Sequence, residues 1–269
     1  MKIFYNKNKL IKFTHNHKII GFVPTMGSLH KGHISLIKKS QSECKNTIVS
    51  IYINKPQFNN TSDYKRYPRV LKKDISILKK LKVDFLYIPK EKQIYPNGPN
   101  KNIKIHSFKK QLCGKFRANH FEAIVDVIDR FIKIINPKKI YMGEKDMQQL
   151  KIVDHFVKIN HRNVKIIGCK TIREKNGVAY SSRNNLLSSS EKLLASKIFK
   201  ILLSKKNKIL NKSISIDLIK KEIINLNVKK IDYIKIYDIN NLLKKNNKVK
   251  KYKIFIAYYL GKTRLIDNI

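Results

Sequence analysis

Two histidines three residues apart stand where a strand-like run of residues gives way to helical spacing. The run Ile19–Val23 is followed by Pro-Thr-Met-Gly-Ser-Leu-His-Lys-Gly-His, and apolar residues at helical spacing come next. Gly27 and Gly32 let the backbone approach a ligand closely, and a helix N-terminus offers unpaired N–H groups to an anion. His30 and His33 can both face that anion, because residues three apart share one side of a helix. A lone histidine there would be an ordinary surface or capping residue, but the pair predicts a phosphate site.

A second polar segment, Gly143–Asp146, follows the strand-like run Ile140–Met142 and opens another helical stretch. In a parallel sheet the two segments would lie at the same edge, where ligands bind in open α/β folds. Lys145 could provide the positive charge that phosphoryl chemistry needs. Asp146 has an alternative role as the N-cap of the helix that follows.

Two further loops carry polar side chains. Ser181, Ser182 and Arg183 are three hydrogen-bond donors in a row and suit an anion, although a plain polar linker would look the same. Asn54–Gln57 follows the strand-like run Ile48–Ile53 and can form a polar wall of the same pocket, or a simple turn.

Short β-branched runs alternate with amphipathic stretches between residues 18 and 169, which is typical of a parallel sheet with helices between its strands. The sequence predicts a Rossmann-like, doubly wound α/β domain over residues 1–170. Its strands are expected at Ile19–Val23, Ile48–Ile53, Phe85–Ile88, Ile140–Met142 and Val164–Gly168. Its helices are expected at Ile34–Ser42, Asp74–Leu81, Phe121–Ile135 and Met147–Ile159.

The character of the chain changes after about residue 171, and a smaller α+β lid domain is expected over residues 171–269. Lys-rich helices are predicted at Glu191–Leu210 and Ile216–Leu226, and strands at Tyr233–Ile239 and Ile254–Leu260. The Lys- and Asn-rich stretch Lys244–Lys253 is interpreted as a solvated turn.

The formal net charge of +41 suggests a nucleic-acid surface, since basic surfaces attract nucleic acids through counterion release. Lysine is spread through every segment, however, together with abundant Ile and Asn, which favours a compositional drift of the whole chain. We therefore expect no specific nucleic-acid partner. A basic RNA- or DNA-binding protein without catalysis is the alternative from another class, and the basic and aromatic residues at Tyr64–Tyr67 could be quoted for it.

Cysteine usage and hydropathy indicate the compartment. Cys44, Cys113 and Cys169 are widely spaced and form no CxxC pair, which argues against a disulfide framework and a zinc site. No segment approaches the roughly 18 apolar residues that span a bilayer, and the N-terminus lacks a continuous apolar run. A cytoplasmic protein without a membrane partner is expected.

The HxGH element resembles the HIGH signature of the nucleotidyltransferase superfamily, which holds the triphosphate of ATP. Further segments narrow the resemblance to the pantothenate synthetases, and they occur in that family's order: PTMGSLHKGH, SIYINKPQF with Tyr67–Arg69, RANHF at Arg117–Phe121, GEKDMQQL at Gly143–Leu150 and SSRN at Ser181–Asn184. The closing GKTRLIDN is also similar. The resemblance implies an ATP-dependent ligase that activates pantoate as an acyl-adenylate and transfers it to β-alanine, giving pantothenate, AMP and diphosphate in the coenzyme A pathway. Another HxGH nucleotidyltransferase is the nearest alternative, and GEKDMQQL together with the Gln57 loop argues against it.

Carried over residue by residue, the resemblance implies a site for ATP as substrate, with His33, His30 and Lys145 as the catalytic groups. The implied ATP-binding residues are Met26, Gly27, Ser28, Leu29, His30, Lys31, Gly32, His33, Gly143, Glu144, Lys145, Asp146, Ile172, Tyr180, Ser181, Ser182 and Arg183. Gln57 and Gln149 would bind pantoate, with Gln57 also close to β-alanine.

The resemblance also implies Mg²⁺ with the triphosphate, and a homodimer. Asp74 is the candidate metal ligand, or else the N-cap of the helix expected from that residue. The chain departs from the family pattern at Pro56, which is displaced by one place, at Tyr180, where Met is usual, and at Cys113, where an acid is usual. These departures concern affinity, not the type of reaction.

Overall fold

The computed structural model describes residues 1–15, 19–243 and 248–269. Six parallel strands form the main sheet, in the order β1 (Lys2–Phe4), β4 (Phe85–Tyr87), β3 (Asn46–Ile51), β2 (Ile20–Thr25), β5 (Lys139–Gly143) and β6 (Lys165–Cys169). The predicted doubly wound parallel sheet is therefore confirmed. The edge strand β1 was not predicted, because three residues are too few to show a period.

The strand order reverses beside β2, whose neighbours in the sheet are β3 and β5. A crevice forms at such a switch point, outside the carboxyl ends of the strands. The HxGH segment follows β2 and the GEKD segment follows β5, so the topology brings both to this crevice.

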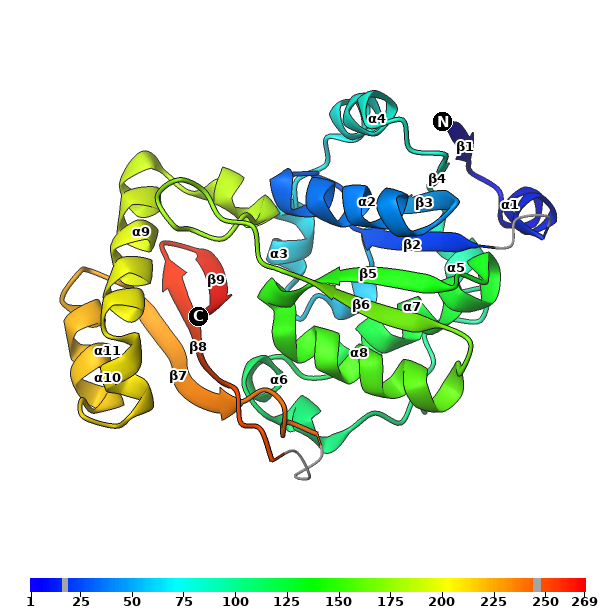
Figure 1. The fold of residues 1–269 in the computed structure, drawn as a ribbon. Coiled ribbons are helices and arrows are strands. Elements are labelled where there is room, and N and C mark those ends of the chain that lie inside the picture. Colours follow the sequence, from blue (N-terminus) through cyan, green and yellow to red (C-terminus); the bar gives the residue numbers. More distant parts are fainter. Residues whose placement is uncertain (16–18, 244–247) are drawn as a thin grey trace.

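Helices cover both faces of this sheet (Figure 1). One face carries α2 (Lys31–Glu43) and α4 (Leu71–Lys80), and the other carries α1 (Lys7–Thr14), α7 (His120–Ile135) and α8 (Met147–Asn160). Strand side chains alternate between the two, because successive residues of a strand point to opposite faces. Phe22 packs on the α7 side, whereas Val23 packs with the residues of α2.

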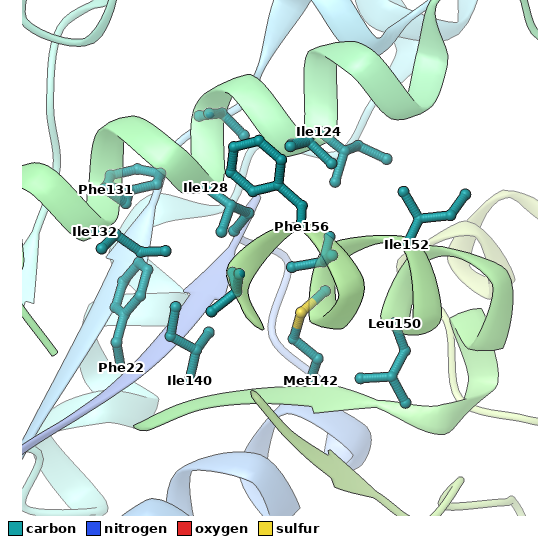
Figure 2. Close-up of a cluster of buried hydrophobic side chains, with 14 of the residues drawn as sticks. Phe22, Ile124, Ile128, Phe131, Ile132, Ile140, Met142, Leu150, Ile152 and Phe156 are labelled. Carbon is teal, nitrogen blue, oxygen red and sulfur yellow. The ribbon is translucent and has the colours of Figure 1, made fainter. Parts of the chain in front are cut away.

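The larger core lies under α7 and α8. Figure 2 shows Phe22 and Ile140 of the strands facing Ile128 and Phe131 of α7, with Phe156 of α8 beside them. The apolar stripe expected on the helix over 121–135 is fully buried there, and it consists of Ile124, Val127, Ile128, Phe131, Ile132 and Ile135. This packing holds the carboxyl ends of β2 and β5 in place.

A three-stranded antiparallel sheet follows in the order β7 (Lys230–Asp238), β8 (Tyr252–Leu260) and β9 (Thr263–Asn268), with the helices α9 (Ser189–Ser204), α10 (Lys206–Leu210) and α11 (Ile216–Ile224). The single helix expected over 191–210 is two helices, separated at Lys205. β9 was not predicted; Gly261, with φ of 52°, makes the tight turn that leads into it. The division of the chain at residue 170 stays a prediction.

Shorter elements fill the connections: the helices α3 (Thr61–Arg66), α5 (Glu91–Ile94) and α6 (Cys113–Phe116), and 3₁₀ turns at Lys55–Gln57, Ser107–Lys110, Glu144–Asp146 and Ser182–Leu186. The predicted turn Lys244–Lys253 lies in part outside the described residues. Of its described part, residues 248–251 are exposed and lead into β8, whereas Tyr252 and Lys253 already belong to that strand, so the predicted turn ends two residues too late. Among the helices of the described part of the chain, none is long and apolar enough to cross a membrane.

Candidate active site

The two histidines stack on each other at the start of α2. His30 is the N-cap residue and the helix begins at Lys31, three residues earlier than expected, so His33 lies in the first turn. The ring centroids are 4.0 Å apart with an interplanar angle of 28°, and both imidazoles face the same side, as predicted. The backbone N–H of His30 donates to Nδ1 of His33 at 3.4 Å, which leaves the His33 proton on Nε2.

Burial and a nearby cation keep both imidazoles neutral. Desolvation, followed by the positive charge of Lys145, lowers the pKa of His30 to about 4. Desolvation, then His30 and Lys145, lowers the pKa of His33 well below its usual range. At neutral pH the pair can therefore donate hydrogen bonds as neutral rings, and Nδ1 of His30 is buried without a hydrogen-bond partner.

The two glycines of the loop have different local roles. Gly27 has φ of 78°, a left-handed conformation that other residues adopt at a cost. Gly32 lies under the His30 ring, and a Cβ there would come within 2.9 Å of that ring. Gly32 therefore makes room for an imidazole as well as for any ligand.

The GEKD segment begins with a 3₁₀ turn, Glu144–Asp146, before α8. Asp146 occupies the N-cap position of α8, but its side chain makes no capping hydrogen bond and is 46% exposed, so the capping alternative is wrong. The Lys145 ammonium lies 3.7 Å from the Asp146 carboxylate. Lys145 and both histidines line the same cavity, so the two loops meet at the switch point.

The serine-rich loop touches the HxGH loop directly. Ser182 Oγ donates to the Ser28 carbonyl at 3.1 Å, and Arg183 forms an ion pair of 2.9 Å with Asp63 of α3. The Tyr180 ring lies nearly parallel to the His30 ring, with 6.2 Å between centroids. This loop therefore covers the histidine pair.

Gln57 is fixed from several directions in the 3₁₀ turn after β3. Its Nε2 lies 3.0 Å from the Met26 sulfur, and its Oε1 accepts from Asn54 Nδ2 at 3.1 Å. Its carbonyl accepts from Arg117 at 3.2 Å and pairs with His120 Nδ1 at 2.8 Å. The turn formed by Lys55–Gln57 includes the displaced Pro56, and it brings Gln57 to the HxGH loop.

The two adjacent glutamines of GEKDMQQL have separate positions. Gln148 is buried; it accepts from the Cys113 backbone N–H at 3.0 Å and donates to the carbonyls of Phe108 and Gln111. Gln149 is half-buried and lines the cavity. Both glutamines line the cavity, but the Gln148 amide is engaged by the backbone of the wall, so Gln149 is the one available to a ligand.

A single cavity of about 480 Å³ joins these loops. Of the predicted site residues it is lined by Met26, His30, Gly32, His33, Gln57, Gly143, Lys145, Asp146, Gln149, Ile172, Tyr180, Ser181, Ser182 and Arg183. The predicted residues outside its lining are Gly27, Ser28, Leu29, Lys31, Glu144 and Asp74.

Sequence reasoning gave no individual role to several residues of this cavity. Asn54 is 1% exposed; besides its bond to Gln57 it accepts from the Tyr95 hydroxyl at 2.7 Å. Arg117 and His120 anchor the Gln57 carbonyl, and desolvation lowers the pKa of Arg117 to about 10. The segments INKPQF and RANHF contained these residues, but mainly as marks of the family resemblance.

This arrangement defines a class: an α/β nucleotide-binding protein with a histidine pair at the helix that opens its switch-point crevice. Residues 2–269 match the family model of pantoate–β-alanine ligase. The chain belongs to this family, and it is a ligase.

Named relatives and solved structures agree with this membership. The chain is 42% identical over 277 residues to the pantothenate synthetase of Buchnera aphidicola from Acyrthosiphon pisum, covering 100% of this chain and 95% of the relative. It is 40% identical over 258 residues to the enzyme from Sulfurihydrogenibium, covering 94% and 92%. A pantoate–β-alanine ligase from Francisella tularensis, complexed with β-γ ATP and β-alanine, is similar with TM-score 0.84 and 39% identity, covering 100% and 97%. The pantothenate synthetase from Thermus thermophilus has TM-score 0.88 and 30% identity, covering 100% and 99%.

Proposed function

We propose that the cavity condenses pantoate with β-alanine at the expense of ATP, through a pantoyl-adenylate. The observation that carries the proposal is the meeting of three groups in one cavity: the histidine pair, the Lys145 loop and two glutamines from separate elements. The first two suit the phosphates of ATP, and the glutamines suit a small hydroxy acid. The relative from Francisella tularensis, complexed with β-γ ATP and β-alanine, supports the same substrates.

In the first step a carboxylate oxygen of pantoate attacks the α-phosphorus of ATP. The bond from that phosphorus to the oxygen bridging the β-phosphate breaks, and diphosphate leaves. In the second step the β-alanine amine attacks the acyl carbon, the bond to the AMP oxygen breaks, and the amine loses a proton. No side-chain nucleophile takes part.

Catalysis then depends on orienting the reactants and on stabilising the negative charge that develops on the phosphate oxygens in the transition state. In well-oriented systems, holding the reactants in place lowers the activation free energy by about 7–11 kcal/mol. His33 Nε2–H and the Lys145 ammonium are aimed at the growing charge on the phosphate oxygens, with His30, Ser181, Ser182 and Arg183 around them. Burial is the main cause that lowers the pKa of both imidazoles, and a phosphate beside them would offset the smaller contribution of the Lys145 charge.

The remaining residue assignments are part of the proposal. Gln57 and Gln149 bind pantoate, and Gln57 also faces β-alanine. ATP lies along the HxGH, GEKD and SSR segments, with Ile172 beside the adenine and Tyr180 over His30. Arg183 exchanges its ion pair with Asp63 for phosphate when ATP binds.

Magnesium enters this scheme with the triphosphate, as MgATP, held mostly by phosphate oxygens and water. Asp74 does not fit the role of its ligand. Each of its carboxylate oxygens already accepts a backbone N–H at 2.8 Å. Within 1–15, 19–243 and 248–269, no group of three His, Cys, Asp or Glu side chains could hold a metal ion.

A homodimer and a cytoplasmic location are further proposals, which rest on the resemblance to the family and on cysteine usage. Light scattering on the purified protein tests the first.

We also propose that nucleic acid is not a specific partner. A filter-binding titration should then show weak binding, indifferent to sequence, that is lost steeply with added salt; a tight, sequence-selective complex would contradict this.

The decisive experiment incubates purified protein with MgATP, pantoate and β-alanine. Pantothenate, AMP and diphosphate should appear in equal amounts. Reactions without pantoate, and reactions with His33→Ala, are the controls. Stoichiometric ADP and phosphate would overturn the adenylate mechanism.

A further inference from the structure

Asp74 is a buried carboxylate that the reaction itself does not use. It lies in the first turn of α4 and is only 1% exposed. The N-cap of α4 is Val70, so the capping role considered for Asp74 is wrong. Its side chain points away from its own helix and reaches the loop after β2.

Both carboxylate oxygens bind that loop. Oδ2 accepts the N–H of Ser28 and Oδ1 accepts the N–H of Leu29, each at 2.8 Å. Ser28 has φ of 52°, a left-handed conformation unusual for a residue other than glycine, and Gly27 before it has φ of 78°. Two consecutive left-handed residues turn the backbone N–H groups inward, and the carboxylate satisfies them.

The other contacts of the loop complete this arrangement. The Gly27 N–H donates to Thr25 Oγ1 at 3.1 Å, and the Ser28 carbonyl accepts from Ser182 Oγ at 3.1 Å. The N–H groups of residues 27–29 are therefore directed into the protein. The first turn of α2, from Lys31 to His33, is then the part of the loop whose N–H groups a bound phosphate would meet.

We propose that Asp74 is a positioning residue, which fixes the backbone of Ser28 and Leu29 and thereby sets the His30 and His33 rings for ATP. It acts through the loop and does not touch substrate or metal. The inference rests on the proposed function in one respect, that the loop binds ATP. Burial raises the pKa of Asp74, while the two N–H donors and the charge of Lys73 oppose that shift.

The test compares Asp74→Asn with Asp84→Asn. Asp84 is a matched control, because its carboxylate also accepts a backbone N–H at 2.8 Å, from Thr47, but outside the cavity lining. In Asp74→Asn one acceptor becomes an NH₂ donor that opposes a backbone N–H. The turnover of Asp74→Asn should fall about tenfold or more, the effect of one buried polar group left unpaired. The Michaelis constant for β-alanine should stay within about twofold, since that substrate does not contact the loop.

The dependence of the rate on Mg²⁺ concentration distinguishes a positioning role of Asp74 from a role as metal ligand. For a positioning residue, the Mg²⁺ concentration that gives half-maximal rate at fixed ATP is the same in Asp74→Asn and in the unchanged protein. If excess Mg²⁺ restores the lost turnover, Asp74 is a metal ligand and the proposal is wrong. Equal losses in Asp74→Asn and Asp84→Asn would overturn it too, because they would show a general loss of stability.

The histidine rings provide a readout independent of turnover. In NMR spectra the His30 and His33 signals should shift in Asp74→Asn and stay in place in Asp84→Asn. If Asp74→Asn does not fold, Asp74→Glu, which keeps both acceptors on a longer arm, takes its place with the same expectations. If the unchanged protein makes no pantothenate, the proposed function fails, whereas the shift of the ring signals still decides the role of Asp74. Unshifted signals would refute it.

Discussion

The two loops that meet at the switch point are held in different ways. The HxGH loop is fixed mainly from within the first sheet's own helices, by Asp74 of α4. The GEKD loop is fixed from the C-terminal strand β9. Nδ2 of Asn268 donates to the carbonyls of Glu144 and Lys145 at 2.8 Å each.

Asn268 is only 2% exposed, and its Oδ1 accepts from Lys253 Nζ at 2.7 Å, so its amide orientation is fixed by strand β8. Arg173 ties the same strand end through a two-pronged pair with Asp267, at 2.6 and 2.9 Å. The contrast teaches that the histidine loop is held mainly by a helix of the first sheet, with Ser182 as a further contact, whereas the loop of Lys145 depends on the packing of the last strand. Damage to the C-terminal segment should therefore reach catalysis through Lys145.

The largest loss of turnover is expected from a change in the HxGH loop. His33→Ala should lower turnover by about a hundredfold or more with the fold intact, because one preorganised donor is worth about 2.7–4 kcal/mol of transition-state stabilisation. Steady-state kinetics and circular dichroism measure the two parts. His15→Ala, at the exposed position that follows α1, is the control. Full turnover in a folded His33→Ala protein would remove the histidine pair from the mechanism.

A smaller loss is expected from the loop held by β9. Asn268→Ala leaves the carbonyls of Glu144 and Lys145 without their donor, so turnover should fall about tenfold. Asn160→Ala removes a comparable bond to a backbone carbonyl away from the cavity, and its turnover should match that of the unchanged protein.

Combining Asn268→Ala with Asp74→Asn tests the comparison itself. Because the two side chains support different loops, their effects on the activation free energy should add to within about 0.3–0.5 kcal/mol. A double variant no worse than either single one would show that the loops are held as one unit.

Much of the fold was predictable because its signals are periodic. The stripe from Ile124 to Ile135 and the β-branched runs of β2 to β6 repeat along the chain, and these were predicted. β1 and β9 were missed because three residues, or six with charges among them, carry no clear alternation. The break at Lys205 was missed because both halves of the segment favour a helix.

The site was predictable where chemistry and spacing coincide, as at His30 and His33. The side chains that hold the two loops in place were not predictable, because their contacts join residues that are distant in sequence. Nothing local distinguishes Asp74 from a capping aspartate, or Asn268 from a surface asparagine, until the tertiary contacts are known. Of the two adjacent glutamines, the family resemblance picked out Gln149 for pantoate, but nothing in the sequence showed that the Gln148 amide is used inside the wall.

A change at Gln57 tests whether the pantoate site and the ATP site are formed by different residues. Gln57→Ala should raise the Michaelis constant for pantoate about tenfold, as expected for a half-buried amide whose loss leaves polar groups of the substrate unpaired, while that for ATP barely changes. Gln41→Ala, which removes a bond to the Leu81 carbonyl away from the cavity, is the control. Loss of ATP affinity with pantoate affinity intact would show that Gln57, through its contact with Met26, serves the nucleotide instead.

The most gradual effect is expected from acid. All eight histidines precede residue 171, and burial lowers the pKa of His30, His33 and His120 in the folded protein. Below about pH 6.5 these histidines bind protons in the unfolded chain but stay neutral in the folded protein. The free energy of unfolding should therefore fall as the pH drops toward 4. Each ring contributes at most about 1.4 kcal/mol per pH unit in that window. Glu43, with its pKa lowered to about 2, acts only at lower pH, and the raised pKa of Asp74 opposes the trend at the acid end.

Urea unfolding at several pH values measures this slope, and His120→Asn should reduce it, since one of the three rings is removed. Hydrogen exchange at about pH 5 should show the first sheet losing protection before β7 and β8, because the chain after residue 170 has no histidine to protonate. Stability that is flat between pH 6.5 and about 4 would mean that the rings titrate in the folded protein as they do in water. The histidine pair would then be charged in mildly acid solution, and the neutral donors on which the proposed mechanism depends would exist only above that range.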